Sequence, residues 1–85
     1  MASIEIYSTA ICPYCAMAKK LLDRKEIAYR EIRVDVDPAK RQEMMNRSRQ
    51  RTVPQIFINN NAIGGYTDLV ALNNSQRLDS LLAES

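Results

Sequence analysis

Hydrophobic and polar residues alternate in two stretches of the N-terminal half. Ser3–Ser8 reads Ser-Ile-Glu-Ile-Tyr-Ser, and its β-branched and aromatic residues predict a first strand. Tyr29–Val34 alternates in the same way and predicts a second strand. The segment from Pro13 to about Lys25 has helical periodicity instead, and strand, helix and strand with short links predict a βαβ unit with parallel strands. The helix face expected to be buried consists of Cys15, Ala18, Leu21 and Leu22.

A second helix is predicted to follow the second strand. Asp37 is suited to cap a helix, and Pro38 fits the first helical position, where a missing N–H costs nothing. The helix is expected to run to about Arg47. Its Met44 and Met45 are interpreted as core residues, because methionine fills irregular apolar space more often than it binds a ligand.

A hairpin and C-terminal helices are predicted for the rest of the chain. Gln55–Ile58 and Ala62–Gly64 flank the run Asn59–Asn61, and asparagine tolerates the positive φ angles of a tight turn. From Thr67 onward the spacing of apolar residues predicts one or two short helices, with a break at Asn73–Ser75.

Length and charge limit what such a chain can do. At 85 residues and 46% hydrophobic, residues 1–85 are expected to form a single domain that buries roughly 60–65% of its unfolded surface. A net charge of +2 is too small to indicate nucleic-acid or membrane binding, and the cluster Arg47, Arg49 and Arg51 is interpreted as a solvated loop. Met1–Glu5 lacks the apolar region of a signal peptide, and no stretch approaches the ~18–20 apolar residues of a membrane span, so a cytoplasmic protein is expected.

The only cysteines, Cys12 and Cys15, form a C-x-x-C motif between the first strand and the first helix. Positions three apart lie on one side of a helical turn, so the two sulfurs can bond to each other. A helix N-terminus favours a thiolate over a thiol, and Pro13 suits the first helical position. Cys12 is therefore the expected nucleophile, and Cys15 the resolving thiol that attacks a mixed disulfide on Cys12.

The cysteine pair is open to other interpretations. A structural zinc site needs four ligands, and one chain with two cysteines and no histidine cannot supply them. Haem attachment needs a histidine where this chain has Ala16. Two inert core cysteines and an iron–sulfur cluster shared between two chains stay open as alternatives. In a reducing compartment, a lone C-x-x-C favours a disulfide that is made and broken during the reaction.

Three motifs together resemble the glutaredoxin family: Cys12-Pro13-Tyr14-Cys15, Thr52-Val53-Pro54 and Gly64-Gly65-Tyr66-Thr67-Asp68. They occur in the family's order and at its spacing, and the resemblance covers essentially the whole chain, nearest to the short bacterial members of the dithiol C-P-Y-C type. It implies an α/β thioredoxin fold, with a four-stranded mixed sheet in the order 2-1-3-4 flanked by helices. It also implies a groove that binds glutathione beside the Cys12 sulfur.

The resemblance assigns a role to each matching position. Tyr14 would line the groove, the backbone of Val53 would pair with the cysteinyl part of glutathione, and Pro54 would follow a cis peptide bond. Thr67 and Asp68 would receive the γ-glutamyl end. The glutathione-binding residues implied in this way are Tyr14, Thr52, Val53, Pro54, Gly65, Tyr66, Thr67 and Asp68, and Arg41 is a further candidate.

One position departs from the family pattern. Many members have a lysine three positions before the first motif cysteine, whereas this chain has Thr9. The glycine carboxylate of glutathione must then depend more on another cation, and Arg41 is the candidate because of its distance before Thr52-Val53-Pro54. Without the resemblance, Asp68 reads as a cap or first-turn acid of a helix and Tyr14 as an exposed aromatic residue.

The expected function is that of a glutathione-dependent thiol–disulfide oxidoreductase acting through Cys12 and Cys15. Glutathione would be a co-substrate, with no tightly bound cofactor or metal, and the partners of this monomer would be glutathionylated or disulfide-containing proteins. One alternative is a thioredoxin-like reductant, which needs neither Tyr14 nor the Gly-Gly-x-x-Asp segment. The other is a dimeric iron–sulfur cluster carrier, which a loop stiffened by Pro13 disfavours.

Overall fold

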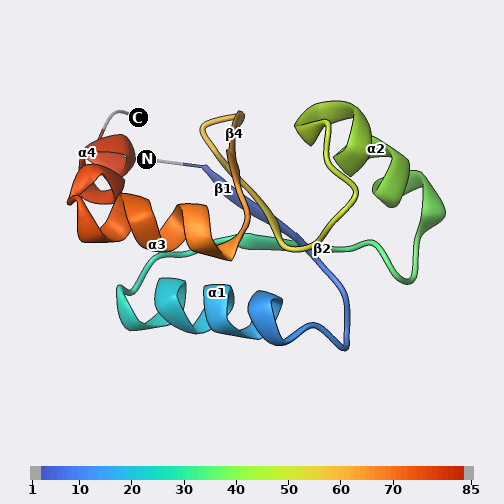
Figure 1. Ribbon diagram of the computed structural model, residues 1–85, viewed down its shortest axis with the longest axis horizontal. Helices are drawn as coiled ribbons and strands as arrows, with labels where there is room; N and C mark the ends of the chain where they lie inside the picture. Colours follow the sequence, from blue (N-terminus) through green and yellow to red (C-terminus); the bar gives the residue numbers. More distant parts are fainter. Residues whose placement is uncertain (1–2, 84–85) are drawn as a thin grey trace.

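The computed structural model describes residues 3–83, and positions 1–2 and 84–85 lie outside this range. Strands and helices follow the predicted order along the chain (Figure 1). The strands are β1 (Ile4–Ser8), β2 (Arg30–Arg33), β3 (Gln55–Ile58) and β4 (Asn61–Gly64). The helices are α1 (Pro13–Arg24), α2 (Pro38–Ser48), α3 (Tyr66–Asn74) and α4 (Arg77–Ala83).

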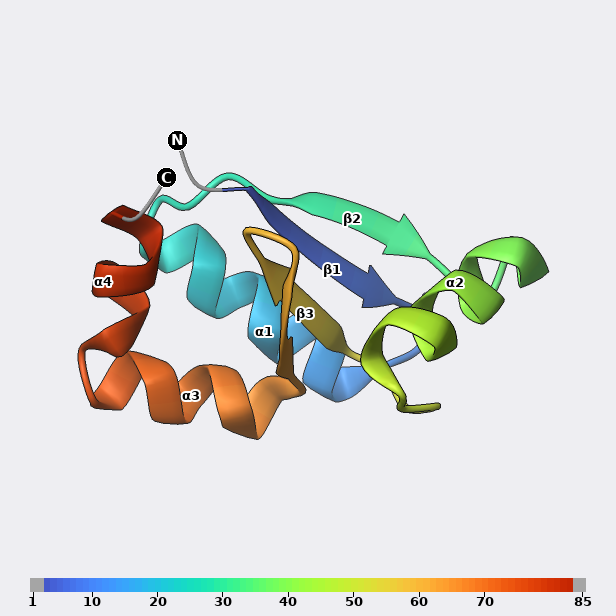
Figure 2. The ribbon, with the colours of Figure 1, turned by 90° about the horizontal axis from the view of Figure 1, so that it is seen from above.

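The four strands form one mixed sheet in the order β2-β1-β3-β4, as predicted (Figure 2). Strand β1 pairs with β2 in parallel and with β3 antiparallel, and β3 pairs antiparallel with β4. Tyr7 therefore stands between Ile32 of β2 and Gln55 of β3. The predicted thioredoxin fold is confirmed, and the carboxyl end of β1 leads directly into the cysteine motif.

Helices cover both faces of the sheet, with α1 and α3 on one face and α2 on the other (Figures 1 and 2). Successive side chains of a strand point to opposite faces, so β1 contributes Ile4 and Ile6 to one core and Tyr7 to the other. The larger core contains Ile4, Ile6, Ala18, Leu21, Leu22, Ile56, Ile58, Leu69 and Leu78. The smaller core contains Tyr7, Ile32, Val34, Met44 and Phe57.

A polar network fastens α2 to the sheet. The Tyr7 hydroxyl donates to Glu43 at 2.5 Å and accepts from Arg47 at 2.8 Å, and Arg47 also donates to Glu5 at 3.0 Å. Burial, reinforced by the Glu43 carboxylate, raises the pKa of Tyr7. The Arg47 guanidinium lies 4.0 Å from the centre of the Phe57 ring. The prediction of a solvated loop was wrong for Arg47, because a planar cation can pack on an aromatic ring while it stays hydrogen-bonded.

The hairpin and the C-terminal helices differ from the prediction in their boundaries. Asn59 and Asn60 have φ angles of 52° and 69°, as a tight two-residue turn requires, and Asn61 already belongs to β4. Asn74 still belongs to α3, so the predicted break at Asn73–Ser75 was placed too early. The turn between α3 and α4 lies instead at Ser75 and Gln76, and Gln76 has φ 65°.

The substitution Gly64→Ala is expected to destabilise the fold by about 1–3 kcal/mol. Gly64 has φ 116°, a backbone conformation that residues with a side chain rarely adopt. An added Cβ would also collide with the Asp68 carboxylate. Gly65→Ala is the matched control, because Gly65 has φ −94° and its nearest neighbour would be the Pro54 carbonyl at 3.5 Å. Urea unfolding measures both variants, and equal midpoints would contradict the prediction.

Candidate functional site

Cys12 caps the N-terminus of α1, as the sequence predicted. Its backbone is extended, with φ −151° and ψ 100°, and its Sγ accepts the backbone N–H of Cys15 at 3.1 Å. The two cysteines form a disulfide. Cys15 is only 1% exposed, whereas Cys12 is half-buried. Because the helix N-terminus directs an N–H at the Cys12 sulfur, it is suited to hold that sulfur as a thiolate after reduction.

The loop before Cys12 is tied to the end of β2. Asp35 accepts the backbone N–H of Ala10 at 3.0 Å and two bonds from Arg33 at 2.6 and 2.7 Å. The Arg33 guanidinium, followed by the Ala10 N–H, holds the pKa of Asp35 well below its usual range. Arg33 is thus engaged by Asp35, which leaves it poorly placed to replace the family lysine at Thr9.

A second polar cluster joins the end of β1 to α1 and was not foreseen. The buried Ser8 hydroxyl donates to Glu31 at 2.5 Å, and Lys19 of α1 contacts the same carboxylate at 2.9 Å. The bonds from Ser8 and Lys19 lower the pKa of Glu31. The one signal in the sequence is a serine at an alternating strand position where an apolar residue is the usual choice.

A groove of about 300 Å³ lies between the start of α1, the segment before β3 and the start of α3. Tyr14 is 58% exposed, and its ring stacks on Tyr66 with 6.0 Å between ring centres. The Val53–Pro54 peptide bond is cis, as the resemblance implied, and the Val53 carbonyl oxygen lies 3.8 Å from Cys12 Sγ. The groove is lined by Tyr14, Thr52, Val53, Pro54, Gly65, Tyr66 and Thr67, all of which the sequence analysis had named.

Asp68 lies outside the wall of this groove. It lines an adjoining hollow that shares Thr52, Gly65 and Thr67 with the groove. Asp68 is the third residue of α3, and its carboxylate accepts the Gly65 N–H at 2.9 Å. The expectation of a first-turn acid is therefore met, while the N-cap itself is Gly65.

Two glutamines belong to the adjoining hollow and were not named from the sequence. Gln50 and Gln55 line it beside Asp68. The Gln55 amide donates to the Thr52 carbonyl at 2.9 Å and to its hydroxyl at 3.2 Å, which holds Thr52 at the junction of the two cavities. A buried glutamine in an otherwise apolar strand is the only signal that could have indicated this role.

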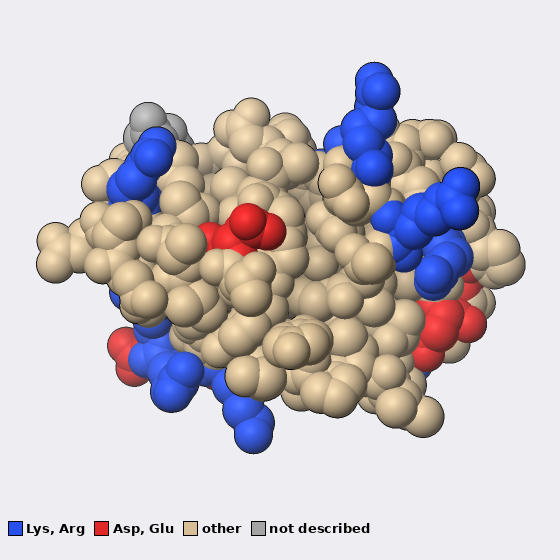
Figure 3. Space-filling model, viewed as in Figure 1, with Lys and Arg blue, Asp and Glu red and all other residues tan. Residues whose placement is uncertain are grey.

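Arg41 is exposed on α2 and lines neither cavity. Its guanidinium lies 3.5 Å from the Arg51 carbonyl oxygen and forms no ion pair within residues 3–83. Figure 3 shows cationic side chains gathered over α2 and an acidic group near the start of α3, with mostly uncharged surface between them. On this face the acidic group near the start of α3 is thus separated from the cations over α2.

The glutaredoxin family model matches residues 4–63. The chain is 50% identical over 82 residues to glutaredoxin 3 of Escherichia coli, a match that covers 96% of this chain and 99% of the relative. The chain belongs to the glutaredoxin family. A glutaredoxin of Pseudomonas aeruginosa is 45% identical over 83 residues, covering 98% of this chain and 99% of the relative. This glutaredoxin is accordingly a thiol–disulfide oxidoreductase.

Solved glutaredoxin structures agree with the fold. The solution structure of a glutaredoxin from Brucella melitensis matches with a TM-score of 0.84 and 48% identity, covering 96% of this chain and 89% of that one. A buckwheat glutaredoxin–glutathione complex matches with a TM-score of 0.89 and 29% identity, covering 98% of this chain and 78% of that one. In residues 3–83 of this glutaredoxin, no helix is long and apolar enough to cross a membrane.

Proposed function

We propose that this protein reduces protein–glutathione mixed disulfides and protein disulfides, with glutathione bound in the groove beside Cys12. The observation that carries the proposal is the position of the Val53 carbonyl oxygen, 3.8 Å from Cys12 Sγ. A backbone acceptor beside the sulfur can pair with the backbone of a peptide whose cysteine is bonded to Cys12. The buckwheat glutaredoxin–glutathione complex supports the same ligand for this chain.

The charges on either side of the groove suit the ends of glutathione. The γ-glutamyl end carries an ammonium group, and Asp68 at the start of α3 offers a carboxylate to it. The glycine carboxylate needs a cation, for which Arg41 on α2 is the proposed partner. Thr52 and Thr67 line the groove between these ends and can hydrogen-bond the peptide.

Deglutathionylation requires only Cys12. Its thiolate attacks the glutathionyl sulfur of a mixed disulfide, so that a bond forms between Cys12 and glutathione while the protein thiolate leaves and takes up a proton. A second glutathione, as thiolate, attacks the glutathionyl sulfur, releasing glutathione disulfide and the Cys12 thiolate. The net reaction consumes one free glutathione, whose sulfur ends in glutathione disulfide while the protein sulfur becomes a thiol. The groove presents the glutathionyl sulfur rather than the protein sulfur to Cys12.

Reduction of a protein disulfide requires both cysteines. Cys12 attacks one sulfur and forms a mixed disulfide with the substrate. Cys15, one helical turn away, then attacks Cys12, so that two substrate thiols leave and the Cys12–Cys15 disulfide of this structure remains. Reduction potentials of glutaredoxins, roughly −200 to −230 mV, lie near the cytosolic glutathione poise, so glutathione can reduce this disulfide.

The proposal extends to the setting of the reaction. Residues 1–85 act as one monomeric domain in the cytoplasm, without a tightly bound cofactor. The substrates are glutathionylated or disulfide-containing proteins, and neither nucleic acid nor membrane takes part. The purified protein should therefore sediment as a monomer and show no visible absorption, whereas a cluster carrier would be coloured.

A comparison of two small disulfides tests the proposed ligand. The protein should reduce a cysteine–glutathione mixed disulfide at least about tenfold faster, in kcat/KM, than the same disulfide with Cys-Gly in place of glutathione. The Cys-Gly compound lacks the γ-glutamyl group, and a charge-assisted hydrogen bond lost with that group is worth about 1.5–3 kcal/mol. Equal values for the two compounds would show that the groove does not recognise glutathione.

A further inference from the structure

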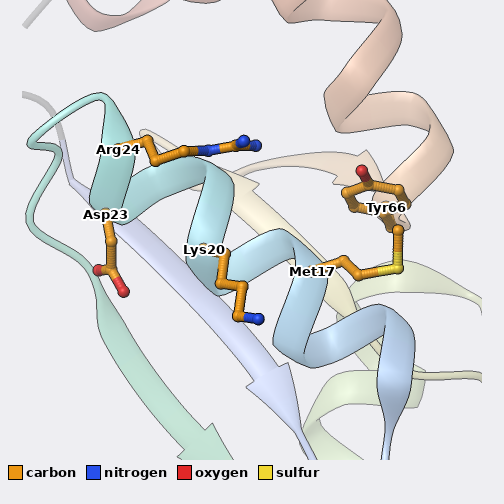
Figure 4. A pocket seen from close by; sticks show the side chains of 5 residues that line it. All are labelled: Met17, Lys20, Asp23, Arg24 and Tyr66. Carbon is orange, nitrogen blue, oxygen red and sulfur yellow. The ribbon is translucent and has the colours of Figure 1, made fainter.

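A second hollow lies against the middle and end of α1 and the start of α3, on the other side of Tyr66 from the glutathione groove. Its volume is about 480 Å³, and it is lined by Met17, Lys20, Asp23, Arg24 and Tyr66 (Figure 4). Tyr66 lines both cavities, so the hollow continues the groove that begins at Cys12. The proposed reaction with glutathione uses none of the other four residues.

The floor of the hollow is apolar and open to solvent. Met17 is 42% exposed, and Figure 4 shows its thioether reaching toward the Tyr66 ring. A methionine sulfur and an aromatic ring form an adaptable surface that accepts apolar side chains of different shapes. This floor is suited to one apolar side chain of a partner.

The rim of the hollow is cationic. Lys20 and Arg24 form no ion pair in the part of the chain that the structure describes, whereas Lys19 is paired with Glu31 at 2.9 Å. Figure 4 shows Arg24 extended toward α3 and Asp23 directed to the other side of α1. Burial raises the pKa of Tyr29, and the charge of Asp23 adds to this, which places Asp23 on the Tyr29 side. The lining thus contains two cations, Lys20 and Arg24, and one carboxylate, Asp23, so its net charge is positive.

We propose that this hollow docks the protein part of a substrate, as an extended acidic segment with one apolar side chain. The apolar side chain would rest on Met17 and Tyr66, and the acidic side chains would lie beside Lys20 and Arg24. The inference rests on the proposed function, because it assumes that the mixed disulfide reacts at Cys12, which brings the substrate cysteine close to that sulfur. Glutathione would occupy one side of Tyr66 and the protein segment the other.

Helix geometry sets the spacing between the substrate cysteine and the docked segment. Lys20 lies eight positions after Cys12, which corresponds to about 12 Å along a helix axis. An extended peptide covers about 3.3 Å per residue, so the docked residues should lie about four positions from the substrate cysteine.

Three glutathionylated peptides that differ only near that position test the proposal. The first carries leucine and two glutamates about four residues from its single cysteine. The second has glutamines in place of the glutamates, and the third has serine in place of the leucine. The wild-type protein should favour the first over the second by about three- to tenfold in kcat/KM, since exposed charge pairs are individually weak. The preference should shrink at high salt, because exposed charges are screened.

Two double variants test whether Lys20 and Arg24 cause the preference for the acidic peptide. Lys20→Gln/Arg24→Gln should abolish the preference for the acidic peptide, because glutamine keeps the helix but removes both charges. Arg30→Gln/Arg77→Gln changes the net charge equally at exposed positions outside both cavities, and it should keep the preference. Met17→Gln should reduce the advantage of the leucine peptide over the serine peptide.

The cysteine–glutathione mixed disulfide has no protein segment to dock, so its reduction tests the proposed function without testing the docking surface. All variants should reduce this small substrate as the wild-type protein does. Equal rates with the acidic and neutral peptides, together with normal reduction of the small substrate, would overturn the docking surface alone. A loss of small-substrate reduction in the Lys20→Gln/Arg24→Gln variant would also overturn it, by assigning these cations to glutathione. If the wild-type protein reduced neither the small substrate nor the peptides, the proposed function itself would fail.

Discussion

The variant Cys12→Ser is expected to lose all activity, while Cys15→Ser should still remove glutathione from proteins and lose most reduction of protein disulfides. Cys12 is half-buried at the N-terminus of α1 beside the groove, and Cys15 is 1% exposed. Only Cys12 can reach an external sulfur, so it takes part in both reactions. Cys15 is required only where a mixed disulfide with the substrate must be resolved.

The two reactions are measured separately, with a glutathionylated peptide and with a protein disulfide as substrates. Alkylation of the reduced protein at neutral pH provides an independent check, because the thiolate is the nucleophile. Cys12 should be labelled first. Faster labelling of Cys15, or full activity of Cys12→Ser with either substrate, would contradict the assignment.

The variant Asp68→Ala is expected to lower kcat/KM with a glutathione mixed disulfide by about 10–100-fold, the equivalent of a charge-assisted hydrogen bond of about 1.5–3 kcal/mol. The proposed role of Asp68 is to hold the ammonium group of the γ-glutamyl end. Its carboxylate also accepts the Gly65 N–H at 2.9 Å, so alanine removes a structural bond as well as a charge.

Asp68→Asn distinguishes the two roles of the carboxylate. The amide oxygen of asparagine can still accept the Gly65 N–H, but the side chain carries no charge. If the charge binds glutathione, Asp68→Asn should lose nearly as much activity as Asp68→Ala. The two variants should still differ in their unfolding midpoints, because only asparagine can keep the bond to Gly65. A loss confined to Asp68→Ala would assign Asp68 to helix capping, and unchanged kcat/KM in both variants would exclude any role in binding.

Alternating side chains were sufficient to predict most of the fold. Ile4 and Ile6 of β1 face one core, whereas the half-buried Glu5 lies on the opposite face with Tyr7, and this produces the period of two seen in the sequence. The end of α3 was misplaced, since asparagine is typical of turns but Asn73 and Asn74 continue α3, which packs against α4. The helix propensity of single residues does not predict such packing.

The groove was predicted from motifs rather than from physical chemistry. Tyr14, Val53 and Thr67 are far apart in the sequence, and only the resemblance to a known family indicated that they meet. Gln55 and the Ser8–Glu31–Lys19 cluster were missed for the same reason, because no local pattern reports a hydrogen bond between distant residues. Arg41 and Asp68 stay predictions, and the structure places both outside the wall of the groove.

The attachment of α2 has a consequence for the dynamics of the molecule. Met44 is the one fully buried residue of α2, whereas α1 buries four, and polar bonds to Tyr7 and Glu5 supply much of the remaining contact. A helix with so little apolar anchorage opens at a lower free energy than the core, so its amides should exchange with solvent sooner than those of α1. In the proposed complex, glutathione spans from α3 to Arg41 on α2. Binding would then slow amide exchange in α2, and part of the binding free energy would be spent on ordering that helix.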